Sequence, residues 1–205
     1  MHNTERLSVE QFVRGLRSIP HEQFKQDRVL RYMSDSQLEL EDLERYTSWK
    51  DGGYARNLIY KNDLFEVLAL CWDIGQESPI HNHSGQLGWA MIQKGTLSIT
   101  NYRLAGCDAL YADGSQPDVC AANCHARVEE VSRIAVAGVG AIAKVNERLT
   151  IHKISNLRSF GERAVSLHVY SFPYDSCIIY DTDSEICRRV QLGYDTTPLE
   201  PLFAS

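Results

Sequence analysis

The sequence predicts a mainly β protein, a small β-barrel with helices packed on it. From residue 54 onward the chain consists of short runs rich in Val, Ile, Leu and Tyr, such as LFEVLALCW, TLSITNY and AVSLHVYSF, separated by Gly, Asn, Asp and Pro. Many short strands without intervening helices favour a barrel or a sandwich. The 205 residues, 43% of them hydrophobic, suffice for one core. We therefore expect one domain over residues 1–205, with helices in 1–50 and the barrel in 54–195.

The N-terminal segment shows the spacing of helices. Ser8 with Gln11 fits a capping box, which marks the start of a helix. Four apolar residues then recur on one helical face: Val9, Phe12, Val13 and Leu16. A second helix is predicted over about 22–33, after Pro20, and a third over about 40–48. We expect these helices to cover one end or side of the barrel.

The composition argues against two classes of partner. The net charge is −6, and nucleic-acid binding depends on Lys and Arg that neutralise phosphates. No stretch approaches the roughly 20 apolar residues that a membrane span needs, and MHNTERLSVEQF lacks the features of a signal peptide. We expect a cytoplasmic protein that binds neither nucleic acid nor membrane, as a monomer or a small homo-oligomer.

Residues 104–138 interrupt the strand pattern and are predicted to form an insertion between barrel strands. The part VCAANCHARVEEV is expected to contain a short helix. Cys107, Cys120, Cys124 and His125 lie in this insertion. Their spacing fits no strong zinc pattern, so a disulfide within the loop or thiols are favoured over a structural zinc site. The other cysteines lie in or beside strand-like runs and are predicted to be small buried thiols: Cys71, Cys177 and Cys187.

Two histidines in the segment GQESPIHNHSGQLGWAMIQKG indicate a metal site. His81 and His83 are two residues apart, so on a strand both imidazoles would project to the same face. Imidazole suits Fe, Zn, Ni and Cu. An HxH pair alone is weak evidence, because such pairs also occur for structural reasons.

The spacing around this pair matches the first motif of the cupins, G-x5-HxH-x4-E-x6-G. Gly75 and Gly95 occupy the glycine positions, but Gly88 stands where most cupins supply an acidic ligand. The second cupin motif, a histidine followed four residues later by Asn, is matched by LTIHKISN, which contains His152 and Asn156. The two segments together propose a site of three histidines: His81, His83 and His152. Zinc would accept the same ligands, so the histidines alone do not name the metal.

Polar and apolar residues alternate in AVSLHVYSFPYDSC. Ser166, His168 and Tyr170 share one face of the predicted strand. Polar side chains inside a barrel are costly unless they are hydrogen-bonded, and a Ser–His–Tyr chain satisfies itself. We expect a relay that aims the Tyr170 hydroxyl at the metal. The alternative is the solvated face of an edge strand.

The chain resembles the cysteine dioxygenase family, a thiol dioxygenase branch of the cupins. The matching pieces are YARNL, LCWDIGQESPIHNHS, IHKISN and AVSLHVYSFPYDSC, within about residues 54–177. The resemblance implies that His81, His83 and His152 hold Fe(II) and that Ser166, His168 and Tyr170 form an outer relay. It also implies that Arg56 grips the substrate carboxylate, that Tyr54 lies in the substrate pocket, and that Cys177 lies near that pocket.

The implied reaction is the oxidation of L-cysteine by O2 to cysteine sulfinic acid. In animal members a cysteine at the position of Gly88 forms a cross-link to the relay tyrosine, which this chain cannot form; it resembles bacterial members there. A related branch that oxidises 3-mercaptopropionate typically has glutamine at the position of Arg56, so Arg56 favours cysteine. Other carboxylate-bearing thiols, including mercaptosuccinate, remain alternatives, as does a non-catalytic cupin that senses or stores a metal or ligand.

Overall fold

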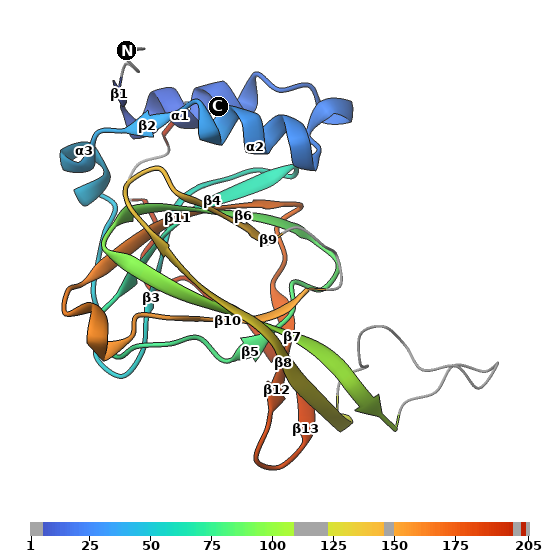
Figure 1. The fold of residues 1–205 in the computed structure, drawn as a ribbon. Coiled ribbons are helices and arrows are strands. Elements are labelled where there is room, and N and C mark those ends of the chain that lie inside the picture. The colour runs from blue at the N-terminus through green and yellow to red at the C-terminus, as the bar shows by residue number, and fades with distance from the viewer. Residues whose placement is uncertain (1–5, 109–122, 146–149, 199–201, 204–205) are drawn as a thin grey trace.

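The computed structural model describes residues 6–108, 123–145, 150–198 and 202–203 (Figure 1). The helical elements are α1 (Val9–Arg17), the 3-10 turn η1 (His21–Gln23), α2 (Gln26–Ser34), α3 (Leu40–Glu44) and the 3-10 turn η2 (Arg158–Phe160). The strands are β1 (Arg6–Leu7), β2 (Gln37–Leu38), β3 (Ala55–Lys61), β4 (Phe65–Trp72), β5 (Ile80–His81), β6 (Leu87–Lys94), β7 (Thr96–Cys107), β8 (Cys124–Ala137), β9 (Ile142–Val145), β10 (Ile151–Ser155), β11 (Ala164–Ser171), β12 (Ser176–Asp181) and β13 (Ile186–Gln191).

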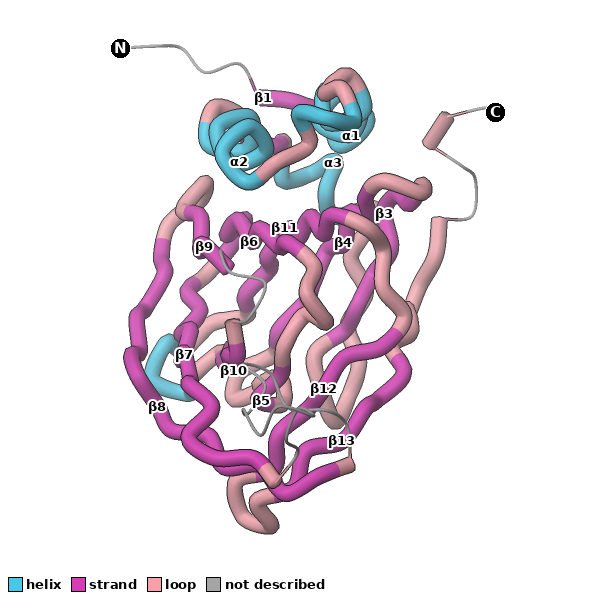
Figure 2. The backbone as a smooth tube through the Cα atoms, turned by 90° about the vertical axis from the view of Figure 1, so that its right-hand side faces the viewer, coloured by secondary structure: helices cyan, strands magenta, loops and turns pink. Residues whose placement is uncertain are grey.

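The larger strands form two groups that enclose the interior. One is an open sheet in the order β3-β4-β11-β6-β9. The other runs β10-β5-β12-β13-β8-β7 and is closed because β7 also pairs with β10. Figures 1 and 2 show the helices over the open sheet and the second group on its other side. The predicted fold class, a mainly β barrel with N-terminal helices packed on it, is confirmed.

The helices cover the open sheet because both surfaces are apolar. The predicted face of α1 is buried: Val9, Phe12, Val13 and Leu16 are at most 1% exposed. The expected capping box is present, since the Ser8 side chain accepts from the Gln11 N–H and the Gln11 side chain accepts from the Ser8 N–H. The second predicted helix is divided into η1 and α2, and the third ends at Glu44, earlier than expected.

Strands β4 and β11 lie in the middle of the open sheet and are buried on both faces. On β11, Val165, Leu167 and Val169 pack with the helices in one core cluster. The alternate residues of β11 face the barrel interior, where Tyr170 packs with Leu68, Leu70 and Trp72 of β4. Because β11 pairs with β4 and β6, the alternative of an exposed edge strand is wrong.

The prediction of a short helix within residues 119–131 is wrong for the part of that segment that the structure describes. Residues 124–137 form β8, a strand that pairs with β7 from Thr96 opposite Ala137 to Cys107 opposite Ala126. Much of β8 is exposed, so the two faces of this strand carry no clear apolar alternation. Cross-strand pairing, which the sequence pattern does not reveal, stabilises the segment instead. Cys120 lies outside the described residues.

None of the described helices has the length and apolar character needed to span a membrane.

Candidate metal centre and substrate pocket

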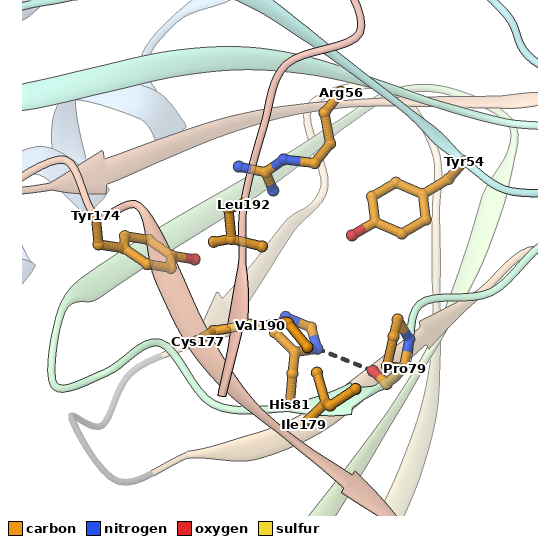
Figure 3. A pocket seen from close by; sticks show the side chains of 9 residues that line it. All are labelled: Tyr54, Arg56, Pro79, His81, Tyr174, Cys177, Ile179, Val190 and Leu192. Atoms are coloured by element: carbon orange, nitrogen blue, oxygen red, sulfur yellow. Dashed lines mark hydrogen bonds between the residues drawn. The ribbon is translucent and has the colours of Figure 1, made fainter. Parts of the chain in front are cut away.

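A small cavity of about 50 Å³ lies beside His81. The guanidinium of Arg56 and the hydroxyls of Tyr54 and Tyr174 point into it (Figure 3). The remaining walls are mainly apolar: Pro79, Cys177, Ile179, Val190 and Leu192. A cation and two phenols on an apolar background suit a small, polar ligand.

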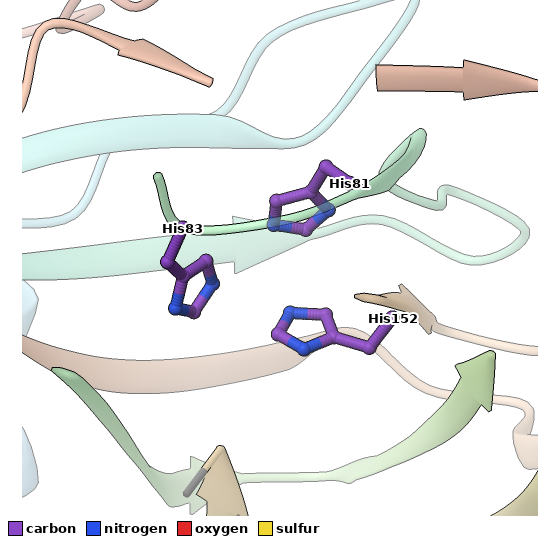
Figure 4. Close-up of side chains that lie close together, drawn as sticks. All are labelled: His81, His83 and His152. Atoms are coloured by element: carbon purple, nitrogen blue, oxygen red, sulfur yellow. The ribbon is translucent and has the colours of Figure 1, made fainter. Parts of the chain in front are cut away.

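The three predicted histidines converge on one point inside the barrel (Figure 4). His81 ends β5 and lies directly opposite His152 of β10, and their ring centroids are 4.6 Å apart. His83 follows two residues after the end of this short strand, with its ring 4.8 Å from that of His152 and 5.4 Å from that of His81. One nitrogen from each ring lies within 4.8 Å of the other two.

Burial keeps the three imidazoles neutral. His83 and His152 are 4% and 1% exposed. Loss of hydration lowers the pKa of His81 to about 4 and holds the pKa values of His83 and His152 well below their usual value. At neutral pH each ring therefore has one nitrogen lone pair to offer. The Nδ1–H of His81 donates to the Pro79 carbonyl at 2.9 Å, which leaves its Nε2 as the acceptor.

The group fits a divalent transition metal. Both ring nitrogens of His83 and Nδ1 of His152 are buried without a hydrogen-bond partner among the described residues, which is costly unless another partner binds there. A cation that accepts imidazole nitrogens would satisfy them. Three protein ligands leave further coordination positions open for small molecules.

The polar side chains of β11 form a hydrogen-bonded chain with a defined direction. The indole N–H of Trp72 donates to Ser166 Oγ at 3.0 Å, and Ser166 Oγ lies 2.8 Å from His168 Nε2. His168 Nδ1 lies 3.0 Å from the Tyr170 hydroxyl. Burial lowers the pKa of His168 to about 3, so its ring is neutral and carries one proton. We assign the Ser166 hydroxyl as donor to Nε2 and Nδ1–H as donor to Tyr170, which leaves the Tyr170 hydrogen for a ligand.

Arg56 is held by the segment that follows β13. Its Nε–H donates to the Gly193 carbonyl at 3.1 Å, and its backbone N–H donates to Asp195 Oδ2 at 2.7 Å. Lys50 in turn binds both carboxylate oxygens of Asp195, at 2.8 and 2.9 Å. Arg56 Nη2 is buried and has no partner among the described residues. The guanidinium is thus fixed at one nitrogen and has another available for a carboxylate.

Tyr174 is a pocket residue that the sequence analysis missed. Its ring centroid lies 5.3 Å from that of Tyr170 and 6.0 Å from that of His83. Burial raises its pKa well above the usual value, so it stays a neutral phenol. Tyr174 lies in the loop after β11, where no strand periodicity indicates which way a side chain points. The only indication in the sequence is that Tyr174 belongs to the segment YSFPYD.

Glu66 is a second residue that the sequence analysis missed. It is fully buried on β4, opposite Tyr170 of β11. The Tyr194 hydroxyl donates to Glu66 Oε2 at 2.5 Å, whereas Oε1 has no hydrogen-bond partner among the described residues. Its signal is available in the sequence, since it is the only charged residue within the run LFEVLALCW.

Gly88 leaves room for two site residues at once. It lies opposite Tyr170 in the pairing of β6 with β11. A Cβ atom built at Gly88 would lie 2.9 Å from His83 Nδ1 and 3.0 Å from Tyr170 Cε1. The His83 ring and the Tyr170 ring, whose centroids are 5.2 Å apart, therefore occupy the space that a side chain would need.

We expect Gly88→Ala to displace the His83 ring or the Tyr170 ring. Overpacking of this kind costs about 1–3 kcal/mol of folding free energy, and a shifted His83 would weaken metal affinity. Urea unfolding and a metal titration measure the two effects. Gly106→Ala on β7 is the matched control, because nothing lies within 4 Å of a Cβ built there. Equal behaviour of the two variants would contradict the steric account.

The barrel and its group of three histidines, two of them buried and one partly buried, define this chain as a cupin with a three-histidine site. A family model of cysteine dioxygenase type I matches residues 1–183. The chain therefore belongs to the cysteine dioxygenase type I family, which confirms the resemblance found in the sequence.

Individual relatives are distant. Human cysteine dioxygenase type 1 is 28% identical over 150 residues, which cover 73% of this chain and 66% of that protein. Cysteine dioxygenase type 1 of Danio rerio is 27% identical over 211 residues, which cover 98% of this chain and 96% of that protein. Among solved structures, the Cnp3 cupin domain of Schizosaccharomyces pombe is similar with a TM-score of 0.42 at 9% identity, covering 63% of this chain and 66% of that chain.

Proposed function

We propose that this protein is an iron-dependent thiol dioxygenase that converts L-cysteine and O2 to cysteine sulfinic acid. The observation that carries the proposal is the arrangement of three neutral imidazoles close to two other groups. Arg56 lines the same cavity as His81, and the Tyr170 ring, whose hydroxyl is hydrogen-bonded to His168, lies beside the His83 ring. In the overall reaction both atoms of O2 are transferred to the sulfur of one thiol, so no additional reductant is required.

Arg56 would select the substrate by its carboxylate. A guanidinium binds a carboxylate with two parallel hydrogen bonds, and its charge does not depend on pH in the working range. Because Arg56 and His81 line the same small cavity, a thiol whose carboxylate lies on Arg56 would have its sulfur directed toward the histidines. The apolar walls of that cavity would disfavour water beside the sulfur.

His81, His83 and His152 would hold the iron. When bound there, iron(II) would supply the Lewis acidity that lowers the pKa of the substrate thiol and the redox chemistry that O2 requires. The protein's own contribution is to bind, orient and donate. Burial raises the pKa of Tyr170, so this residue keeps its proton and donates it as a hydrogen bond into the pocket.

Product analysis tests the proposal most directly. Iron-loaded protein is incubated aerobically with L-cysteine, 3-mercaptopropionate, mercaptosuccinate and cysteamine, and the products are analysed by mass spectrometry together with O2 uptake. We expect a product two oxygen atoms heavier than the thiol, formed fastest from cysteine. A preference for 3-mercaptopropionate or mercaptosuccinate would transfer the proposal to that thiol. Binding without any oxygenated product would indicate a sensor or storage protein instead.

The relay has its own test in Tyr170→Phe. We expect this variant to bind iron normally, because Tyr170 is not one of the three histidines, but to turn over more slowly or to consume more O2 than it forms sulfinate. General acid–base and hydrogen-bonding groups of this kind contribute about 10²–10⁴-fold. Tyr102→Phe, on β7, is the control. Unchanged turnover with unchanged coupling would remove the relay from the mechanism.

A further inference from the structure

The segment that follows β13 lies along β3, the edge strand of the open sheet. We call residues 192–196 the strap. Asn57 and Thr196 form a parallel bridge, the Leu58 N–H donates to the Thr196 carbonyl at 2.9 Å, and the Thr196 hydroxyl donates to Asn57 Oδ1 at 2.8 Å. At the other end of the strap, Leu192 lines the candidate substrate pocket (Figure 3). The strap therefore connects the edge of the sheet with the wall of the pocket.

Arg56 is bound to this strap by its backbone and by its side chain. Its backbone N–H donates to Asp195 Oδ2 at 2.7 Å, and its carbonyl accepts from the Asp195 N–H at 2.8 Å. Its Nε–H donates to the Gly193 carbonyl at 3.1 Å. Because the guanidinium is planar, the bond at Nε also sets the direction of the other two nitrogens. The direction in which Arg56 Nη2 points therefore depends on where the strap lies.

Tyr194 connects the strap to the interior of the barrel. Its hydroxyl donates to Glu66 Oε2 at 2.5 Å, and Lys61 Nζ donates to the same hydroxyl at 3.1 Å. Glu66 is 0% exposed and precedes Leu68 by two residues on β4. Alternate residues of a strand share a face, and Leu68 packs in the barrel interior, so Glu66 points there too. The Tyr194 side chain therefore links an exposed lysine with a buried carboxyl group.

We expect this hydrogen bond to stabilise the strap more than the ion pair of Lys50 with Asp195 does. That pair is partly exposed, at 43% and 30% of the two side chains, and ion pairs in contact with water contribute little. Glu66, in contrast, is buried, where a carboxyl group without a hydrogen bond costs folding free energy. Because Glu66 Oε1 has no hydrogen-bond partner among the described residues, the stabilisation of this carboxyl depends on the Tyr194 hydroxyl.

We propose that Glu66 and Tyr194 are positioning residues whose hydrogen bond holds the strap against the barrel and thereby fixes the Arg56 guanidinium at the pocket. The consequence for substrate selection rests on the proposed function, in which Arg56 binds the substrate carboxylate. Without the bond, the Gly193 carbonyl would no longer hold Arg56 Nε in one place. Thiols that carry a carboxylate should then bind more weakly, whereas the three histidines, which lie in other segments, should keep their arrangement.

Hydrogen exchange tests the positioning without any need for enzymatic activity. Wild-type protein and Tyr194→Phe are labelled in D2O under native conditions, and peptides that cover β3 and the strap are followed by mass spectrometry. We expect exchange in these peptides to rise about tenfold in Tyr194→Phe, the effect on local opening of losing one hydrogen bond to a charged group. Exchange in β11 should stay unchanged. Tyr102→Phe is the matched control, because it also removes the hydroxyl of a partly exposed tyrosine.

Substrate selection supplies the second measurement. In iron-loaded Tyr194→Phe, KM for L-cysteine should rise about three- to tenfold with little change in kcat, since the guanidinium is present but less well placed. KM and kcat for cysteamine, which has no carboxylate, should remain as in the wild type. Glu66→Gln should also raise KM for cysteine. The double variant should show less than the product of the two fold-changes, because both substitutions act on one bond.

Three results would overturn the proposal. The first is equal exchange of β3 and the strap in Tyr194→Phe and Tyr102→Phe. The second is an unchanged KM for cysteine in Tyr194→Phe when removal of the Arg56 charge does raise it. The third is a double variant whose effect is the full product of the single effects. If the wild type oxidises no thiol, the proposed function fails by itself, and the exchange of the Arg56 peptide still decides whether the Tyr194–Glu66 bond fixes this residue.

Discussion

We expect a His152→Ala variant to lose the iron site proposed here and, with it, the proposed oxidation of a thiol. His152 is 1% exposed, and its ring faces His81 and His83 at 4.6 and 4.8 Å. Its removal leaves only two of the three imidazoles of the group, which should weaken metal binding. Even changes to residues behind metal ligands cost about 10–100-fold in affinity or activity, so we expect a loss of at least about 100-fold.

Iron content per chain after desalting and the rate of sulfinate formation measure these losses, and circular dichroism reports whether the barrel stays folded. His21→Ala is the matched control, because His21 is an exposed histidine in η1, outside the cluster. A His152→Ala protein that retained a full equivalent of iron and normal turnover would show that the ion binds elsewhere.

The second large effect is expected for Arg56→Gln. The substitution keeps a hydrogen-bonding side chain but removes the charge that we assign to the substrate carboxylate. Hydrogen bonds to charged groups contribute about 1.5–3 kcal/mol, which corresponds to a loss of about 10- to 160-fold in kcat/KM for cysteine. The loss should appear mainly in KM if the carboxylate is bound equally in the ground state and the transition state.

Cysteamine provides the internal control for this variant, because it lacks the carboxylate. Its rate should be nearly the same in wild-type protein and in Arg56→Gln, so the preference for cysteine should decline. Arg163→Gln is the matched control variant: this exposed arginine binds Asp73 on the surface, at 2.9 Å. If cysteine and cysteamine lost rate equally in Arg56→Gln, Arg56 would have a structural role instead of a role in carboxylate binding.

The sequence predicted those features that depend on local periodicity. The two-residue spacing of Ser166, His168 and Tyr170 placed them on one face of a strand, and they form one hydrogen-bonded chain. The same rule predicted that His81 and His83 lie close together, and they do. The assumption that both lie on one strand was wrong, because β5 ends at His81 and His83 lies in the segment that follows it. The roles of all five residues remain predictions.

Features that depend on contacts between residues far apart in the sequence could not be predicted from local periodicity. Arg56 has no local signal and was found only through its family motif, whereas Glu66 and Tyr194 meet across 128 residues of sequence. The end of β7 and the whole of β8 were predicted as part of an irregular insertion, because the largely exposed surface of β8 shows no apolar alternation from which a strand could be predicted. Cys187 of β13 lies directly opposite Cys124 of β8, a neighbour that depends on strand register and that the sequence spacing does not indicate.

Trp72 has a consequence for how ligand binding is observed. Its ring stacks on Tyr54 at a centroid distance of 4.4 Å, and its N–H donates to Ser166, so one indole contacts both the pocket and the relay. The other two tryptophans lie elsewhere, Trp49 beneath the exposed Arg163 and Trp89 against Phe24 of the helical layer. The protein thus carries an intrinsic fluorophore directly behind Tyr54 of the pocket, and we expect its emission to change when a thiol occupies that pocket.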